Sequence, residues 1–178
     1  MSFVKLNLGC GKDYREGYIN VDIVKSVKPD ILADLNFDLP FRDCIAEEVL
    51  LIDVLEHVND PCHLIEEVWR VCIPKAKVII RAPHFTSAST YADMQHKRGF
   101  SVRVFDDYTG CTRWSFQFKP RFKIVEKRIM FSKGKLVYNR LVEWLVNLRP
   151  FMQNLYENTL LRCVFPADSV YFELKVIK

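Results

Sequence analysis

The sequence predicts an α/β protein whose strands form a mostly parallel sheet covered by helices. Short β-prone runs follow one another through residues 4–81, a helical pattern precedes the last of them, and two longer alternating runs come near the end of the chain. An open α/β sheet binds its ligand at the carboxyl ends of its strands. We therefore expect a site at the polar residues that end these runs, which are Gly9, Asp22, Asp34, Asp53 and His84.

The first half of the chain provides five strands and a helix. Asp43 is expected to cap a single helical turn through Glu47. Asp60 followed by Pro61 predicts the start of a longer helix, which Pro74 ends. The run 49–52 is continuously apolar, as in a strand buried on both faces. The expected strands are 4–8, 18–23, 30–33, 49–52 and 77–81.

The second half ends in two strands, 122–131 and 170–177, which alternate in polarity and suggest an antiparallel hairpin at the sheet edge. Between them, 136–163 has helical periodicity with an interruption at Arg149-Pro150, and we expect it to form an inserted cap. Strict alternation in the strand over 122–131 places four side chains on one face: Lys123, Val125, Lys127 and Ile129.

The composition is that of one globular domain. The chain has 178 residues, of which 49% are hydrophobic and 27% charged, and this excludes a disordered, collagen-like or coiled-coil protein. The formal net charge of +4 hides an asymmetry, because residues 1–80 carry 9 basic and 14 acidic side chains whereas residues 81–178 carry 17 and 8. We infer that the two halves do different jobs.

No apolar stretch is long enough for a signal peptide or a membrane span, so we expect a cytoplasmic protein with no transmembrane segment. The cysteines form no Cys-x-x-Cys pair and have no matching histidine spacing. We expect buried free thiols rather than disulfides or zinc ligands at the six positions 10, 44, 62, 72, 111 and 163.

A glycine motif, Leu8-Gly9-Cys10-Gly11, directly follows the first strand, where it permits a sharp turn and close approach to a ligand. Asp22 ends the next strand and is expected to accept hydrogen bonds from two ribose hydroxyls. NAD binding requires a third glycine, but Asp13-Tyr14 stand in its place. With LNLGCG, NVD, ADL, LPF and VLEHV in order, residues 4 to about 83 resemble the class I S-adenosylmethionine-dependent methyltransferases, in particular the methyltransferase type 11 group.

The resemblance implies a Rossmann-like fold with a seven-stranded, mostly parallel sheet of order 3-2-1-4-5-7-6 and a helical cap between the last two strands. It also implies methyl transfer with S-adenosyl-L-methionine as cofactor. Residues 1–178 then form one methyltransferase domain, with a cofactor-binding half over 1–83 and an acceptor-binding half over 84–178. The implied cofactor residues are Asn7, Gly9, Cys10 and Gly11 at the methionine part, Asp22 and Ile23 at the ribose, Asp34 and Leu35 at the adenine, and Asp53 and Val54 at the far wall.

Two features depart from the family pattern. Asn7 stands where an acid is usual, so its contact with the cofactor ammonium brings no charge. Only ten residues, 12–21, join the first two strands, where the family normally has a full helix. This short loop resembles that of bacterial methyltransferases associated with glycan and cell-surface biosynthesis. The same departures favour the alternative of a non-catalytic, cofactor-binding or scaffolding subunit.

A hydroxyl or amine acceptor needs a base close to the transferred methyl group. The loop after residue 83, which leads to a short helix over 102–108 that Ser101 is expected to cap, resembles the Pro-His … Asp … His … Phe-Ser stretch of the glycan-associated branch. We expect catalytic roles for His84, from its place after the strand end, and for Asp93 and His96, as a pair three residues apart on one helical face.

We assign no metal site. Glu56-His57, next to Asp53, is similar to a string that holds a divalent ion in some quinone-biosynthesis methyltransferases, so metal binding and a quinone-precursor acceptor stay as alternatives. The favoured role of Glu56 and His57 is structural, in fixing the loop after the strand over 49–52.

Residues 119–140 carry eight Lys or Arg side chains and one acid. Such a run either guards an edge strand against aggregation or binds an anionic acceptor, such as a sugar phosphate or a lipid-linked glycan. Nucleic acid is the weaker acceptor, because Trp144, Phe151 and Tyr156 lie at helical spacing among Leu and Val. The apolar stripe of 136–148 is expected to pack on its own sheet, with an acceptor-site lid, a homodimer contact or a membrane surface as alternatives.

Overall fold

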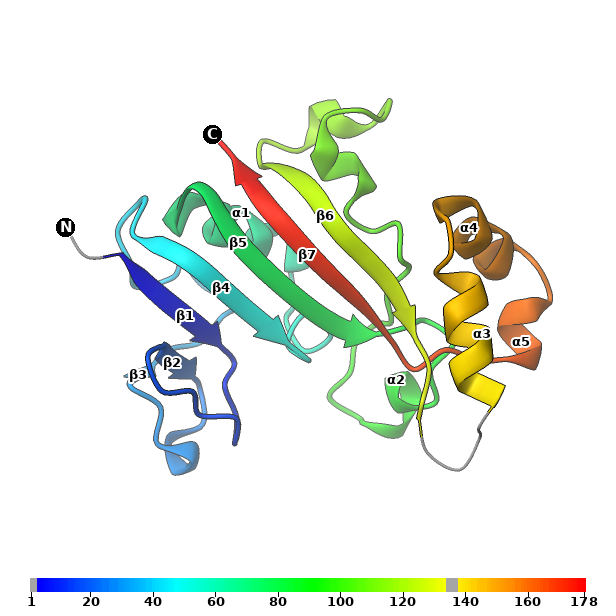
Figure 1. Cartoon of the computed structure of the whole chain (residues 1–178). Helices are drawn as coiled ribbons and strands as arrows, with labels where there is room; N and C mark the ends of the chain where they lie inside the picture. Colours follow the sequence, from blue (N-terminus) through cyan, green and yellow to red (C-terminus); the bar gives the residue numbers. More distant parts are fainter. Residues whose placement is uncertain (1–2, 134–137) are drawn as a thin grey trace.

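The computed structural model describes residues 3–133 and 138–178 and contains a seven-stranded sheet of order β3-β2-β1-β4-β5-β7-β6 (Figure 1). Strands β1 to β5 pair in parallel, whereas β7 runs antiparallel to both β5 and β6. This confirms the predicted fold class, strand order and terminal hairpin. The strands are β1 (Val4–Leu8), β2 (Ile19–Asp22), β3 (Ile31–Leu32), β4 (Ala46–Ile52), β5 (Cys72–Pro83), β6 (Arg121–Met130) and β7 (Ser169–Ile177).

The helices divide into one that covers the sheet and a group that forms the predicted cap. Helix α1 lies behind β4 and β5, and α3 to α5 gather beyond the carboxyl end of β6 (Figure 1). None of the helices in the described residues is long and apolar enough to cross a membrane. The α-helices are α1 (Pro61–Val71), α2 (Ser89–Ala92), α3 (Tyr138–Val146), α4 (Pro150–Asn158) and α5 (Leu161–Val164), with 3-10 turns at Lys25–Val27, Asp106–Thr109 and Ser115–Gln117.

Helix α1 starts where the sequence predicts. The Asp60 carboxylate accepts hydrogen bonds from the backbone N–H groups of Cys62 and His63, and Pro61 occupies the first turn. Its apolar face enters the same buried cluster as β4 and β5. The helix ends at Val71, before Pro74, because Cys72 already pairs with Ala46 of β4 as the first residue of β5.

Two predicted helical segments are wrong. Residues 43–47 form no helical turn, because Cys44 has a left-handed backbone (φ 52°) and Ile45 donates its N–H to the Val71 carbonyl, which starts β4 at Ala46. Residues 102–108 contain turns and the 3-10 turn at Asp106–Thr109 rather than an α-helix.

Strict alternation along β6 also fails. A register shift lies between Ile124 and Glu126, so Val125 is an extra residue in the strand. Phe122 and Ile129 are both buried. They are seven positions apart, so an unbroken alternation would place their side chains on opposite faces of the sheet. The sequence pattern did not reveal this bulge, because charged residues stand on both sides of it.

The cap helices cover the free edge of β6 with side-chain hydrogen bonds. The Asn147 side chain pairs with both the N–H (2.9 Å) and the carbonyl (2.7 Å) of Ile129. Glu143 accepts from the Phe131 N–H at 3.0 Å, and Gln153 donates to the Lys127 carbonyl at 2.9 Å. The edge is therefore protected by polar groups of α3 and its neighbours.

The predicted helical region is confirmed as three helices, and Pro150 begins α4 at the expected interruption. Residues 136 and 137 of the expected stripe lie outside the described part of the chain. All six cysteines are free, but only Cys10 and Cys72 are buried, so the expectation of buried thiols is wrong for the other four.

Candidate functional site

A pocket of about 390 Å³ opens at the carboxyl ends of β1, β2 and β4. This is the edge of the sheet at which the sequence analysis expects a ligand. Eight of the ten predicted cofactor residues line the pocket; the exceptions are Asn7 and Cys10. The lining residues are Gly9, Gly11, Asp22, Ile23, Val24, Val27, Asp34, Leu35, Asn36, Asp53, Val54, His57, Val58 and Gln95.

The glycine turn after β1 is required by both conformation and space. Gly9 has a left-handed backbone (φ 66°), and a Cβ atom added there would lie 2.6 Å from Val54 Cγ2. Gly11 is also left-handed (φ 49°), but no atom lies within 4 Å of its position for a Cβ. Gly9 therefore allows β1 and the loop after β4 to approach each other along the pocket wall.

Three carboxylates stand around the pocket. Asp22 is held by the backbone N–H groups of Gly11 (2.7 Å) and Val24 (2.8 Å), one to each oxygen. Asp34 accepts from the backbone and side-chain amides of Asn36. Asp53 has a left-handed backbone (φ 56°) and forms an ion pair with Arg81 on the neighbouring strand β5. The acids are thus fixed before a ligand arrives.

Asn7 has a structural role in the short loop that the sequence analysis singled out. Its side chain is buried and donates to the Asp13 carbonyl (2.8 Å) and to Asn20 Oδ1 (3.0 Å). Asn20 in turn bonds the backbone of Arg15 and the carboxylate of Asp30. This network of side chains holds residues 12–18 where the family normally has a helix, so the missing acid at position 7 does not remove a charge from the pocket wall.

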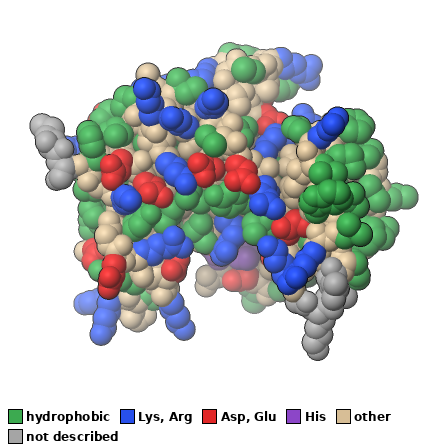
Figure 2. Space-filling view, in the orientation of Figure 1, with side chains coloured by type: hydrophobic (Ala, Val, Ile, Leu, Met, Phe, Trp, Pro, Cys, Tyr) green, Lys and Arg blue, Asp and Glu red, His purple; other side chains and the backbone are tan. Residues whose placement is uncertain are grey.

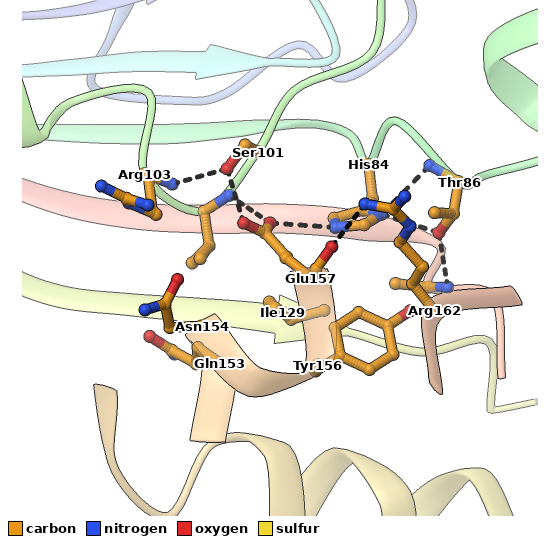
Figure 3. Close-up of polar contacts among 12 residues, drawn as sticks. His84, Thr86, Ser101, Arg103, Ile129, Gln153, Asn154, Tyr156, Glu157 and Arg162 are labelled. Carbon is orange, nitrogen blue, oxygen red and sulfur yellow. Dashed lines mark hydrogen bonds and ion pairs between the residues drawn. The ribbon is translucent and has the colours of Figure 1, made fainter. Parts of the chain in front are cut away.

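His84 is not exposed to the pocket. Its side chain is fully buried, and the Thr86 N–H donates to Nδ1 at 3.1 Å, so Nε2 carries the proton and donates to Glu157 Oε1 at 3.1 Å (Figure 3). Burial alone would raise the pKa of Glu157, but hydrogen bonds from His84, Ser101 and the Val102 N–H lower it. This geometry favours a positioning role for His84, which ties α4 to the end of β5.

Asp93 and His96 meet, but not on a helical face, because α2 ends at Ala92 and Asp93 is extended. His96 Nε2 lies 3.8 Å from the Asp93 carboxylate, and its Nδ1 donates to the Ser89 carbonyl at 2.9 Å. The His96 ring packs edge-on against the ring of His57, which lines the pocket, with 4.7 Å between centroids. His96 itself does not line the pocket, and its catalytic role stays a prediction; the sequence analysis did not foresee its contact with His57.

The loop that carries His96 is fastened to the segment after β4. Lys97 donates its N–H to the Glu56 carbonyl at 2.8 Å, and Arg98 donates to the carbonyls of Val58 and Asn59. This brings ligand atoms of Glu56, His57 and His96 within 4.8 Å of one another, a set that a divalent cation can use. Asp53, which the sequence analysis placed in such a set, pairs with Arg81 instead.

Glu56 is the buried acid of this group. Neither of its carboxylate oxygens has a hydrogen-bond partner among the described residues, and 1% of the side chain is exposed. Burial raises its pKa to about 7, and the nearby Asp53 charge adds to the shift.

The pocket fits S-adenosylmethionine by its donor and acceptor groups. Carboxylates suit ribose hydroxyls, an adenine amino group and the positive charges of the ammonium and sulfonium. The apolar side chains of Leu35 and Val54 offer walls for the adenine and the thioether carbons. The fold is the Rossmann-like methyltransferase fold, and the groups around the pocket are suited to S-adenosylmethionine.

Comparisons with known proteins agree with this fold and cofactor. Residues 6–80, which are less than half of the chain, match the family model of the methyltransferase domain, and this match supports S-adenosylmethionine-dependent methyl transfer as the activity. The alternative of a non-catalytic subunit is therefore set aside. No curated protein matches the sequence.

Solved structures show the same fold at low identity. A putative methyltransferase from Bacillus halodurans superposes with a TM-score of 0.64 and 10% identity, over 99% of this chain and 94% of that one. The YcgJ protein from Bacillus subtilis gives 0.61 and 13%, over 99% and 92%. An S-adenosylmethionine-dependent methyltransferase from Archaeoglobus fulgidus gives 0.56 and 17%, over 98% and 86%. At these identities the likeness establishes the fold alone.

Proposed function

We propose that the enzyme methylates a hydroxyl or amine of a small anionic acceptor of the glycan or sugar-phosphate type. The observation that carries this proposal is a second cavity, of about 550 Å³, in the half of the chain over residues 84–178. It begins at Phe85, just beyond the carboxyl end of β5, and its lining includes Arg103, Arg113, Arg162 and Trp114. Guanidinium groups recognise carboxylates and phosphates, and aromatic faces pack against sugar rings.

The acids of this cavity are already engaged. Asp106 pairs with Lys127 at 2.6 Å, Asp107 accepts from Thr112, and Glu157 binds His84 and Ser101. Arg113 stacks on Trp114 at 4.6 Å and forms no ion pair with any residue that the structure describes. The lining carries three arginines and three acids and so has no net formal charge, but Arg113 is a cation without an ion-pair partner among the described residues, and it is the group we propose for an anionic acceptor.

Among the predicted catalytic residues, His96 has the geometry of a base. Because its Nδ1–H donates to the Ser89 carbonyl, Nε2 keeps its lone pair and can accept a proton from the acceptor. Asp93, at 3.8 Å, stabilises the imidazolium that results. S-adenosylmethionine, when bound, supplies the activated methyl group, and the protein aligns the acceptor with it.

An acceptor screen with labelled S-adenosylmethionine tests the proposal. We expect label transfer to uronic acids or sugar phosphates and not to the matching neutral sugars. Arg113→Gln is expected to raise KM for the anionic acceptor about tenfold while leaving S-adenosylmethionine affinity unchanged. Arg42→Gln, an exposed arginine outside both cavities, is the control. Preferred methylation of neutral sugars, quinone precursors or RNA would contradict the proposal.

A further inference from the structure

The outer face of the helical cap is apolar. Figure 2 shows hydrophobic side chains gathered over α3, α4 and α5 on the right of the molecule. We call this surface the cap face. Its most exposed large side chains have between 49% and 80% of their surface open to solvent, and they are Leu141, Trp144, Leu148, Phe151, Leu160 and Val164.

Helix α3 differs from an ordinary surface helix. Two of its three buried residues are polar, since Asn139 and Glu143 bond the backbone after β6 and only Val146 is apolar. The apolar Leu141 and Trp144 of the same helix face outward. A helix that packs on its own domain normally turns its apolar side inward. Local packing therefore does not explain the apolar side chains of the cap face, and an exposed patch of this kind marks an interaction surface.

The charges of the cap have the same division. Its only acids, Glu143 and Glu157 within the described residues 138–165, are buried and satisfied by internal contacts. The exposed charges are positive: Arg140 and Arg149 are exposed and form no ion pair with any part of the chain that the structure describes. The cap face thus presents apolar side chains flanked by cations and no exposed acid.

We propose that the cap face docks on the surface of an anionic lipid bilayer, with α3 and α4 lying in the interface plane. Amphipathic helices with Trp, Phe and Leu on one side and arginines at its border bind such surfaces. Trp144 suits the headgroup level, where aromatic rings of membrane proteins collect. No described helix can span the bilayer, so the contact is peripheral.

Charge favours a lipid surface over a second copy of the chain. A symmetric pairing of two cap faces would bring Arg140 and Arg149 of one copy toward the same cations of the other, with no exposed acid to compensate them. An anionic headgroup layer neutralises both arginines and so attracts this face of the protein. A nucleic acid would leave the aliphatic centre of the face without a partner.

Docking would place the second cavity close to the membrane. Asn158 and Arg162, which line that cavity, belong to the cap, and α4 is tied to the end of β5 through Glu157 and His84 (Figure 3). A lipid-linked acceptor could then present its headgroup to the cavity. This consequence rests on the proposed function, but the docking itself does not, because it needs neither cofactor nor acceptor.

Vesicle flotation tests the docking. The full-length protein is mixed with phosphatidylcholine vesicles with and without phosphatidylglycerol. We expect binding to the anionic vesicles only, and release by high salt. Phe151→Ala should weaken binding about tenfold, because it removes one inserted aromatic side chain. Phe37→Ala is the matched control, since Phe37 is 69% exposed and Phe151 68% exposed, but Phe37 lies far from the cap in sequence.

Tryptophan fluorescence provides a second readout, which shows whether Trp144 itself enters the lipid surface. Lipid binding should shift the emission to the blue in wild type and in Trp114→Phe, but not in Trp144→Phe. Circular dichroism of each variant checks that it is folded. The proposal is overturned if anionic vesicles do not bind, or if Phe151→Ala binds as tightly as Phe37→Ala. It is also overturned if sedimentation velocity shows a dimer that Phe151→Ala dissociates, because a second copy then occupies the cap face.

Discussion

Glu56 holds a carboxylate that folding removes from water without a hydrogen-bond partner among the described residues. Such a group destabilises the folded state whenever it is ionised. In the unfolded chain its pKa returns to the ordinary value of 4.5, whereas in the folded chain it is about 7. Well below pH 4.5 the group is protonated in both states and costs nothing. As pH rises from 4.5 to 7 only the unfolded state ionises, so the folded state loses stability relative to it, and above pH 7 the loss is complete.

Glu56→Gln is therefore expected to stabilise the protein in alkaline solution. The gain is about 3 kcal/mol well above pH 7 and below about 1 kcal/mol near pH 5, because each pH unit between the two pKa values contributes about 1.4 kcal/mol. Urea unfolding at both pH values, with a chelator present, measures it. Glu47→Gln, on an exposed glutamate, should show no such pH dependence. An equal gain at both pH values would mean that the burial of the charge is not the cause.

Gly9→Ala is expected to weaken S-adenosylmethionine binding at least tenfold, since the new methyl group would press Val54 into the pocket. Gly17→Ala is a close control, because Gly17 also has a left-handed backbone (φ 79°) but has no atom within 4 Å of the added Cβ. Calorimetric titration of both variants separates crowding from backbone strain. Equal losses of affinity would assign the effect to strain alone.

His96→Ala is expected to lower kcat about a hundredfold, the usual contribution of a general base, with little change in cofactor affinity. His63→Ala serves as the control. His63 lies on helix α1, pairs with Asp38 and does not line the pocket. Turnover on an anionic acceptor, followed against pH, measures the effect. Full activity of His96→Ala would transfer the role of base to another group.

At the scale of single elements, the edge of the sheet depends on contacts that periodicity cannot reveal. Helix α3 is amphipathic, and the sequence analysis expected its apolar stripe to pack on the sheet. In the structure polar side chains of the cap face the sheet. They form hydrogen bonds with N–H and carbonyl groups at the edge of β6 that would otherwise be buried without partners. The expectation holds for Val142 and Val146, which pack on the core, but not for Leu141 and Trp144, which are exposed.

Asn147→Ala is expected to destabilise the protein by about 3 kcal/mol, because it leaves the N–H and carbonyl of the fully buried Ile129 without partners. Asn154→Ala, on an exposed asparagine of α4, should cost less than about 0.5 kcal/mol. Chemical denaturation of the two variants gives the comparison. A loss near zero for Asn147→Ala would show that water replaces the side chain at this edge.

At the scale of the whole molecule, the split of charge near residue 81 coincides with the end of β5. The acidic half supplies Asp22, Asp34 and Asp53 to a pocket for a positively charged cofactor. The basic half supplies the arginines of the second cavity and of the cap. The modest net charge of +4 is therefore the sum of a negatively charged first half and a positively charged second half.

Cofactor binding is expected to stabilise the whole fold, since the pocket joins three strands of one sheet. At a concentration one hundred times Kd, S-adenosylmethionine adds about 2.7 kcal/mol, which corresponds to a rise in Tm of about 5–10 °C. Differential scanning calorimetry measures the shift. Asp22→Ala should abolish most of it, whereas Asp38→Ala, an exposed acid outside the pocket, should not. A full shift in Asp22→Ala would place the cofactor elsewhere.

The sequence by itself determined the features that depend on near neighbours: the glycine turn after β1, the acids that end the strands and the Asp60 cap of α1. These follow from backbone conformation and strand direction, which a few adjacent residues control. Only the tertiary structure decided the partners of buried polar groups. His84 forms a hydrogen bond with Glu157, 73 positions away in the sequence, and Asn7 with Asn20, 13 positions away. A buried polar group bonds whichever partner the fold brings next to it, and sequence spacing does not reveal that partner. These contacts could therefore not be predicted from the sequence.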